Sequence, residues 1–273
     1  MINQLVKFAL ATISLSFLSG CFDNTSDTDR LCSDNPELQC EFLNMDDGQC
    51  RIPRTDLVWH KHHVLLNPSD NNKIQEIAFV SAYRRCLELA AQIEPIDQRN
   101  RKANRVETMV YLGEEQERLV EAIKQSDSAE VLYFLWSQTG DDTARRRFLQ
   151  REGKPEMETA ELQYALATFY SSRNDKKTEQ LLHHSLALSE PENVNVDIFK
   201  TLSSLYYRNH ELDQAYVWSM VAKEYGVQIA SDKELAYLYR DLQANTLIEL
   251  DHLTETILKE IELGQYLSRS QSQ

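Results

Sequence analysis

Glycine and proline are scarce in this chain, with seven glycines and six prolines among 273 residues. Average usage of these two residue types together is about 12% of a protein. Sandwiches and barrels need such turn residues at frequent intervals between their short strands. The shortage therefore argues against an all-β protein and predicts an all-α fold built from long helices.

Sequence motifs of catalysis are also missing. The chain has no glycine-rich phosphate loop and no His-Glu-x-x-His, Gly-x-Ser-x-Gly or Ser-x-x-Lys motif. His183 and His184 are neighbours in an expected helix, where adjacent side chains point in different directions and form a poor chelate. We therefore expect no enzyme activity, no cofactor and no metal site.

Basic residues are in the minority, with 29 Lys and Arg against 43 Asp and Glu, for a formal net charge of −14. Such a surface repels the phosphate backbone of nucleic acids, which binding proteins neutralise with basic side chains. The one basic run that we single out, Arg99 to Arg105, is predicted to be a solvated helix face paired with nearby acids. Nucleic acid is therefore not an expected partner.

The first 20 residues are typical of a secretory signal peptide, with Lys7 before an apolar region over residues 8–18. That region is shorter than the roughly 20 residues that span a bilayer. The sequence Leu18-Ser19-Gly20-Cys21 then resembles the lipobox of bacterial lipoproteins. The resemblance implies cleavage before Cys21 and acylation of that cysteine. The alternative is an ordinary cleaved signal peptide followed by a coincidental cysteine.

The lipoprotein resemblance also implies a location. Bacterial lipoproteins with Asp directly after the acylated cysteine tend to stay in the inner membrane, and this chain has Phe22 there. We therefore expect a lipid anchor in the outer membrane, with the protein facing the periplasm. Residues 21–31 are polar without an apolar period, so they are predicted to form a flexible tether. Without residues 1–20 the formal charge is −15.

Four further cysteines are present, an even number that predicts two disulfides in an oxidising compartment: Cys32, Cys40, Cys50 and Cys86. Three pairings are possible. We favour Cys32–Cys40, which closes a short loop, and Cys50–Cys86, which would attach an irregular segment, residues 32–69, to a helix. The alternative is a zinc site that combines these cysteines with nearby histidines, although the spacings match no compact two-cysteine knuckle.

Those histidines lie in the segment 55–66, whose β-branched and aromatic residues stop at the turn signal Asn67-Pro68. This composition predicts a short strand. On a strand, His60 and His62 would share one face while His63 points to the other. Two histidines are too few for a closed metal site, so we expect them to pack against the first helix.

Helical periodicity begins near residue 70, and residues 70–127 are expected to form the N-terminal helices. The first helix should run from Asp70 to about Ile93. A second should start near Ile96, and Gly113 should break or bend it before a third helix over residues 114–125. The acid pair Glu114-Glu115 would then lie at a helix start, where carboxylates complement the helix dipole.

Residues 128–226 contain three similar helix–turn–helix segments. Their first helices carry Leu132, Leu166 and Leu202, which are 34 and 36 residues apart. This period and content resemble the tetratricopeptide repeat, and residues 215–226 also resemble the second helix of Sel1-type repeats. The resemblance implies a solenoid of three degenerate units. Their turns are expected at Gly140-Asp141, Asn174-Asp175 and His210-Glu211.

A solenoid must cover its ends. Ser231 and Glu234 match the capping-box motif of a helix start, and an apolar stripe continues to about Ile261. Residues 227–273 are therefore predicted to be capping helices, with residues 268–273 frayed.

The sequence favours a non-catalytic adaptor that binds another envelope protein or peptide. In tetratricopeptide-like units the first helices line a groove, which here places five residues on that groove: Phe134, Tyr164, Thr168, Lys200 and Tyr207. The alternative for these side chains is burial between units. The chain is also similar to an uncharacterised family of bacterial lipoproteins, which implies no function.

A second function class is an envelope hydrolase or a small-ligand carrier that uses the N-terminal disulfide region. A closed polar pocket near the segment from Trp59 to His63 would favour this class over an adaptor.

Overall fold

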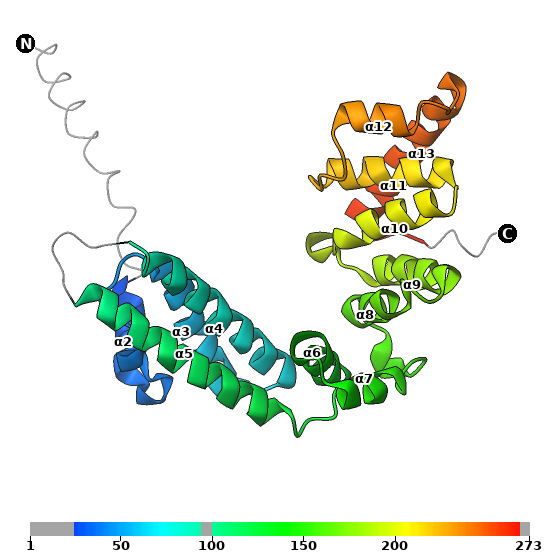
Figure 1. Cartoon of the computed structure of the whole chain (residues 1–273). Coiled ribbons are helices and arrows are strands. Elements are labelled where there is room, and N and C mark those ends of the chain that lie inside the picture. The colour runs from blue at the N-terminus through cyan, green and yellow to red at the C-terminus, as the bar shows by residue number, and fades with distance from the viewer. Residues whose placement is uncertain (1–24, 94–99, 268–273) are drawn as a thin grey trace, which may run out of the picture. The chain divides into compact units, whose positions relative to one another are not determined.

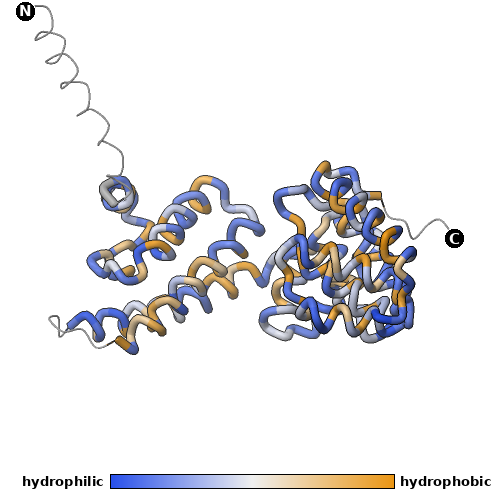
Figure 2. The backbone as a smooth tube through the Cα atoms, turned by 90° about the horizontal axis from the view of Figure 1, so that it is seen from above, coloured by the Kyte–Doolittle hydropathy of each residue, from blue (hydrophilic) through white to orange (hydrophobic). Residues whose placement is uncertain are grey.

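The computed structural model describes residues 25–93 and 100–267, and all regular structure within these ranges is helical. The predicted all-α fold class is therefore confirmed. The chain divides into two compact units, residues 1–126 and 127–273, which are described separately. Figure 2 shows hydrophobic and hydrophilic residues alternating along the helices, the pattern of amphipathic helices with one buried face. None of the described helices is both long and apolar enough to cross a membrane.

The N-terminal unit is a set of three long helices preceded by shorter ones (Figure 1). In chain order, its elements are α2 (Thr25–Asp34), η1 (Pro36–Leu38), η2 (Cys40–Phe42), α3 (Arg51–Leu66), α4 (Asp70–Ala90) and α5 (Arg101–Ile123). Helix α4 packs against both α3 and α5. The fully buried side chains between them include Leu57, Val58, Tyr83, Leu87 and Leu112.

The predicted strand over residues 55–66 is wrong, because these residues belong to α3. Its buried positions are Arg54, Leu57, Val58 and Lys61, spaced three and four residues apart as on one helix face. Packing of that face overrides the β propensity of the valine and tryptophan. The segment 32–69 is consequently mostly helical rather than irregular. The expected tether also contains part of α2 from residue 25 onward, and residues 21–24 lie outside the described part.

Gly113 does not break the helix as predicted, because α5 is continuous from Arg101 to Ile123. A Cβ at this position would meet only Arg84 Nη1, at 3.9 Å, so the glycine sits in ordinary helical surroundings. The pair Glu114-Glu115 therefore lies inside a helix and not at a helix start. Helix α4 ends at Ala90, close to the expected Ile93, and the predicted start near Ile96 lies outside the described residues.

Two disulfides hold the short elements to the long helices. Cys32–Cys40 joins α2 to η2, and Cys50–Cys86 joins the residue before α3 to α4. They follow the same pairing that the sequence favoured. Leu43 lies in the chain between Cys40 and Cys50, and its carbonyl accepts a hydrogen bond of 2.5 Å from the Tyr83 hydroxyl of α4.

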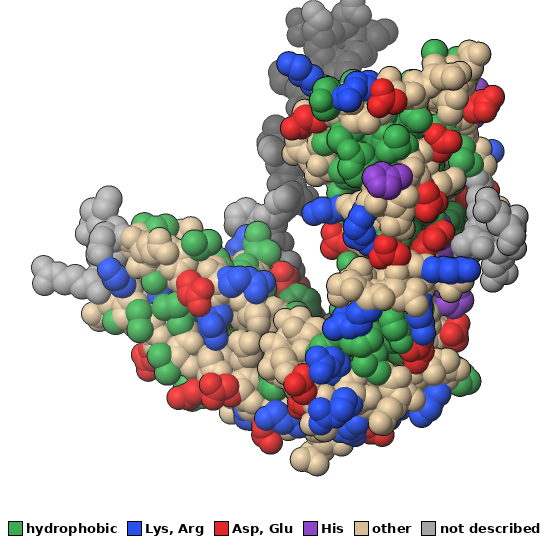
Figure 3. All heavy atoms as spheres, turned by 45° about the vertical axis from the view of Figure 1, so that its right-hand side comes forward, with side chains coloured by type: hydrophobic (Ala, Val, Ile, Leu, Met, Phe, Trp, Pro, Cys, Tyr) green, Lys and Arg blue, Asp and Glu red, His purple; other side chains and the backbone are tan. Residues whose placement is uncertain are grey.

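The basic run is only partly solvated. Arg105 is buried and forms an ion pair with the buried Asp47, so the prediction of a solvated face is wrong for this residue, whereas Lys102 is exposed. Arg99 lies outside the described residues. A second basic run, from Arg145 to Arg147 in α7, was not singled out in the sequence, and it also pairs with acids. Figure 3 shows Lys and Arg side chains interspersed with Asp and Glu on the face that it presents.

The C-terminal unit consists of helix hairpins. Its elements are α6 (Ala129–Thr139), α7 (Asp142–Leu149), η3 (Pro155–Met157), α8 (Ala160–Tyr170), α9 (Asp175–Leu188), η4 (Pro191–Asn193), α10 (Asp197–Arg208), α11 (Leu212–Glu224), α12 (Asp232–Leu238) and α13 (Ala244–Glu262). Within three consecutive pairs the helices pack closely: α6 with α7, α8 with α9, and α10 with α11. Neighbouring pairs are linked by contacts of α6 with α8 and of α9 with α10.

Each hairpin turns where the sequence predicted. Gly140 ends α6 with φ 72°, a left-handed conformation that glycine adopts without a steric penalty, and Asp141 caps α7. Asn174 caps α9, accepting from the Lys177 backbone N–H at 3.0 Å. His210 takes φ 62°, and Glu211 separates it from the first residue of α11. The helices after each turn can therefore fold back on the helices before them.

Small side chains are buried inside the hairpins, where they let the helices approach: Ala144, Ala165, Ala167, Ser203, Ala215 and Ala222. Large side chains such as Leu202, Phe199 and Trp218 fill the core between them. Helix α13 packs against α11 and buries Leu250, Ile257 and Ile261. The capping box of Ser231 and Glu234 at the start of α12 is confirmed.

Candidate functional site

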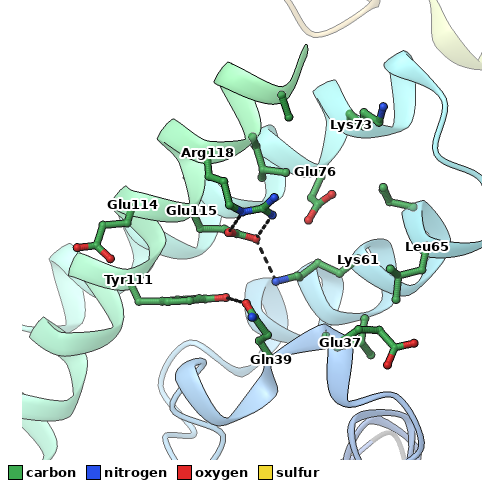
Figure 4. A pocket seen from close by; sticks show the side chains of 14 residues that line it. Glu37, Gln39, Lys61, Leu65, Lys73, Glu76, Tyr111, Glu114, Glu115 and Arg118 are labelled. Carbon is green, nitrogen blue, oxygen red and sulfur yellow. Dashed lines mark hydrogen bonds and ion pairs between the residues drawn. The ribbon is translucent and has the colours of Figure 1, made fainter. Parts of the chain in front are cut away.

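A cavity of about 640 Å³ lies within the N-terminal unit (Figure 4). Helix α3 contributes Lys61, α4 contributes Glu76, and α5 contributes Tyr111, Glu115 and Arg118. The apolar part of its wall is formed by Leu38, Val64, Leu65, Leu119 and Ala122. The cavity therefore combines charged groups with an apolar surface, as small-ligand sites do.

Glu115 is the centre of an ion network in this cavity. Arg118 donates to both of its oxygens, from Nε to Oε2 at 2.7 Å and from Nη2 to Oε1 at 2.9 Å. Lys61 donates from Nζ to Oε1 at 3.2 Å, and the Lys61 side chain is itself buried. Burial alone would raise the pKa of Glu115, but the hydrogen bonds of Arg118 and the charge of Lys61 outweigh it and lower the pKa. Glu115 is consequently ionised, with both oxygens occupied.

Glu76 differs from Glu115 although both are buried acids. It is 4% exposed, and within the described residues no donor hydrogen-bonds to its carboxylate. In Figure 4 this carboxylate points into the space between Arg118 and Lys61. Burial raises the pKa of Glu76, and the nearby charge of Glu115 adds to the effect, whereas Lys61 and Arg118 oppose it. Of the two buried carboxylates in the cavity, Glu115 is thus satisfied and Glu76 has free acceptor capacity.

Tyr111 closes one side of the cavity. Its hydroxyl donates to Gln39 Oε1 at 2.9 Å, which ties α5 to the η1–η2 region. Burial raises the pKa of Tyr111 to about 12, with a further contribution from the Glu115 charge. The phenol is therefore neutral and acts as a donor near neutral pH.

The three histidines of α3 do not meet at a metal site. His60 Nε2 lies 2.8 Å from the Asn72 carbonyl, and His63 Nε2 lies 3.2 Å from Asn72 Nδ2, so both contact the start of α4. On a helix His60 and His62 do not share a face, which corrects the strand-based expectation. In the part of the chain that the structure describes, no group of three or more His, Cys, Asp or Glu side chains is placed to hold a metal ion.

The residues predicted to line a partner groove lie on the first helices of the three hairpins. Phe134 in α6 and Tyr164 in α8 are half-buried, whereas Thr168 in α8 and Lys200 and Tyr207 in α10 are exposed. Tyr164 packs against the hydrophobic core of the unit. Burial raises the pKa of Tyr164, and electrostatic interactions with Asp197 and Tyr133 raise it further. Thr168, Lys200 and Tyr207 are thus the accessible members of the five.

The charged cavity was missed in the sequence, although a signal was present. Glu115 lies between Leu112 and Leu119, which are spaced three and four residues from it and buried on the same face. Glu76 and Lys61 likewise occupy core-facing positions of α4 and α3. Charged residues are almost never buried unless they are paired. An acid or lysine within a helix's apolar stripe therefore indicates a buried polar site.

The architecture and the cavity together define a disulfide-stabilised, all-α protein with a charged cavity between three helices. Residues 18–220 match the model of a family described as "Protein of unknown function (DUF2989)". The match covers well over half of the chain, which belongs to this family. Neither a curated protein nor a solved structure is matched.

Proposed function

We propose that the protein is a lipid-anchored adaptor of the bacterial cell envelope, which binds a protein or peptide partner through its C-terminal helix hairpins. The observation that carries the proposal is the arrangement of α6, α8 and α10. These first helices of successive hairpins recur with leucines 34 and 36 residues apart; α6 contacts α8, and α9 packs against both α8 and α10. Tetratricopeptide and Sel1-type units bind their partners along such a row of helices, and we assign these hairpins to that class.

The proposed anchor is Cys21, acylated after cleavage of residues 1–20 at the lipobox-like sequence Leu18 to Cys21. Each buried methylene of an acyl chain contributes about 0.8 kcal/mol, so several chains hold a folded domain at a bilayer. Phe22 favours the outer membrane over the inner one. The two disulfides support an oxidising compartment such as the periplasm, since disulfides are rare in the cytosol.

The proposed partner surface centres on Tyr207, whose side chain is 43% exposed. An exposed tyrosine offers a large contact area and a polar tip at low entropic cost. Lys200 and Thr168 are exposed on the same row of first helices. This mixture suits an extended or helical segment of another protein.

The test compares partner capture by three tyrosine variants of the full lipidated chain, purified from membranes. Tyr207→Ala should lose most of the captured partner while its melting temperature stays unchanged. Tyr237→Ala is the matched control, because Tyr237 is 67% exposed on α12, outside the proposed surface. Tyr164→Ala should destabilise the unit, by up to about 3 kcal/mol, because its ring packs against the core. Equal capture by the Tyr207 and Tyr237 variants contradicts the proposed surface.

The charged cavity supports a second function, a small-ligand carrier built on the N-terminal unit. Lys61, from the segment between Trp59 and His63, lines this cavity together with Glu76, to whose carboxylate no side chain or backbone group of the described residues donates. Binding of a ligand there is separate from the adaptor proposal, which concerns the C-terminal unit alone.

A further inference from the structure

The buried Glu76 carboxylate lacks a hydrogen-bond donor in the described part of the chain, which is unusual for a charged group that is 4% exposed. Burying a carboxylate without hydrogen bonds is costly, and a buried polar group without a protein partner calls for an explanation, such as a functional role or a bound water or ion. The neighbouring Glu115 shows the ordinary solution, since Arg118 and Lys61 occupy both of its oxygens. Glu76 therefore has acceptor capacity that faces an open cavity (Figure 4).

We propose that this cavity binds a primary ammonium group carried on an apolar stem, with the Glu76 carboxylate accepting its hydrogen bonds. The inference rests on the small-ligand carrier function and names its ligand chemistry. An ammonium group supplies three donors and a positive charge, which is what the Glu76 carboxylate lacks.

The charges around the cavity favour a cation over an anion. Lys61 and Arg118 are already paired with Glu115 and are not free to hold an anionic group. Four carboxylates line the cavity, namely Glu37, Glu76, Glu114 and Glu115, against three cationic side chains, and the third cation, Lys73, points away from Glu76 in Figure 4. The formal charge of −14 adds a long-range attraction for cations.

An organic cation fits better than a metal ion. Calcium takes six to eight oxygen ligands, and magnesium requires octahedral coordination. Of the two buried carboxylates here, Glu76 is free and Glu115 is fully engaged by Arg118 and Lys61, while Glu37 and Glu114 are exposed. The described residues also contain no cluster of acids or histidines arranged around a metal position. A single hydrogen-bonding carboxylate is enough for an ammonium group.

The apolar wall of the cavity specifies the rest of the ligand. Leu38, Val64, Leu65 and Leu119 line it beside the charged groups. Burying a short chain of methylene groups against such side chains is favourable. A free alkylamine and a lysine side chain of a peptide share this chemistry.

The test is a saturation-transfer NMR titration of the full chain, at mildly alkaline pH, with hexylammonium, hexanol and hexanoate. We expect hexylammonium to bind at least tenfold more tightly than hexanol and hexanoate, because only the ammonium group forms charge-assisted hydrogen bonds with Glu76. Nα-acetyl-lysine amide serves as a fourth probe. If it binds as tightly as hexylammonium, the natural source is a peptide, and if it binds more weakly, the source is a free amine.

Two acid variants locate the binding group. Glu76→Gln keeps the shape of the side chain and removes its charge, and we expect it to weaken hexylammonium binding at least tenfold. Glu117→Gln is the matched control, since Glu117 is an exposed acid of α5 that is not among the residues lining the cavity. It should change binding less than twofold. Unchanged binding by the Glu76→Gln protein overturns the inference.

A further variant keeps the test valid if Glu76→Gln does not fold. Leu65 is exposed at the cavity, so Leu65→Lys is compatible with the fold and places a tethered ammonium group there. This group should compete with hexylammonium and weaken its binding at least tenfold. Tighter binding of hexanol or hexanoate than of hexylammonium overturns the ammonium inference and leaves the carrier function standing. If none of the probes binds at millimolar concentrations, the ammonium inference and the carrier function are both overturned.

Discussion

Arg105 Nε lies 2.5 Å from Asp47 Oδ2, and their side chains are 3% and 2% exposed. A second contact joins Arg105 Nη2 to Asp47 Oδ1 at 3.2 Å, and Arg105 Nη1 donates to the Ala90 carbonyl. The hydrogen bond from Arg105 outweighs burial and holds the pKa of Asp47 below its usual range. This pair ties α5 to the segment between the two disulfides and to the end of α4.

Arg105→Ala should destabilise the N-terminal unit by about 3–5 kcal/mol, because it leaves the Asp47 charge buried without its partner. The free energy of opening is measured by hydrogen exchange of the α4 and α5 amides in the full chain. Glu88→Ala is the control, since it removes an exposed ion pair with Arg84 and should cost no more than about 1 kcal/mol. Equal effects of the two changes would show that the buried pair has no special role.

The two disulfides should contribute unequally to stability. Cys50–Cys86 spans 36 residues and Cys32–Cys40 spans 8. Chain-entropy reasoning then gives about 3.8 kcal/mol for the longer loop and about 2.5 kcal/mol for the shorter. Replacing each pair with alanine and measuring urea unfolding of the N-terminal unit tests this order. Greater destabilisation by loss of Cys32–Cys40 would contradict the entropic account.

His183 lies in a buried chain of hydrogen bonds in the C-terminal unit. Its Nδ1 is 2.6 Å from the Tyr266 hydroxyl, and its Nε2 is 2.9 Å from the Tyr206 hydroxyl. Since Tyr206 donates its own proton to Glu179 Oε1 at 2.8 Å, we infer that His183 donates from Nε2 and accepts at Nδ1. Burial lowers the pKa of His183 to about 4 and keeps the imidazole neutral.

This neutral histidine predicts a loss of stability in mild acid. The unfolded chain binds a proton at the ordinary histidine pKa of about 6.5, whereas the folded chain resists protonation until about pH 4. Stability is therefore complete above pH 6.5 and falls as the pH drops towards 4, by about 3 kcal/mol in total. His183→Gln should remove this share of the pH dependence. Parallel stability curves for both proteins across this range would refute the assignment.

Cys21→Ala tests the proposed lipid anchor. Without the acylated cysteine, the chain should accumulate as an unprocessed precursor or be released into the soluble periplasm. Immunoblotting of membrane and soluble fractions measures both outcomes. Cys32→Ala is a suitable control, because it also removes one cysteine but leaves the lipobox-like sequence intact. Unchanged size and membrane fractionation of the Cys21 variant would exclude lipidation.

Local features of the chain were readable from residue types at short spacing. The scarcity of glycine and proline predicted the all-α class, and the turns at Gly140, Asn174 and His210 lie where expected. The capping box of Ser231 and Glu234 was likewise predictable. These features depend on a few adjacent residues, through backbone conformations and hydrogen bonds that the sequence specifies directly.

The secondary structure of two segments was not predictable in the same way. The segment 55–66 has strand-like residue types, yet it is helical because its spaced apolar face packs against α4. Gly113 is tolerated inside α5, whose two ends are both held by packing. In each case long-range packing outweighs a local preference of roughly 1 kcal/mol.

By itself, the sequence determined the helical class, the hairpin turns and the number of cysteines available for pairing. Only the tertiary structure decided that Lys61, Glu76 and Glu115 meet at one cavity. These residues come from three helices, and nothing in their local spacing relates one helix to another. Their burial follows from the packing of α3 and α5 against α4, which leaves Glu115 paired and Glu76 free to accept a ligand's hydrogen bonds.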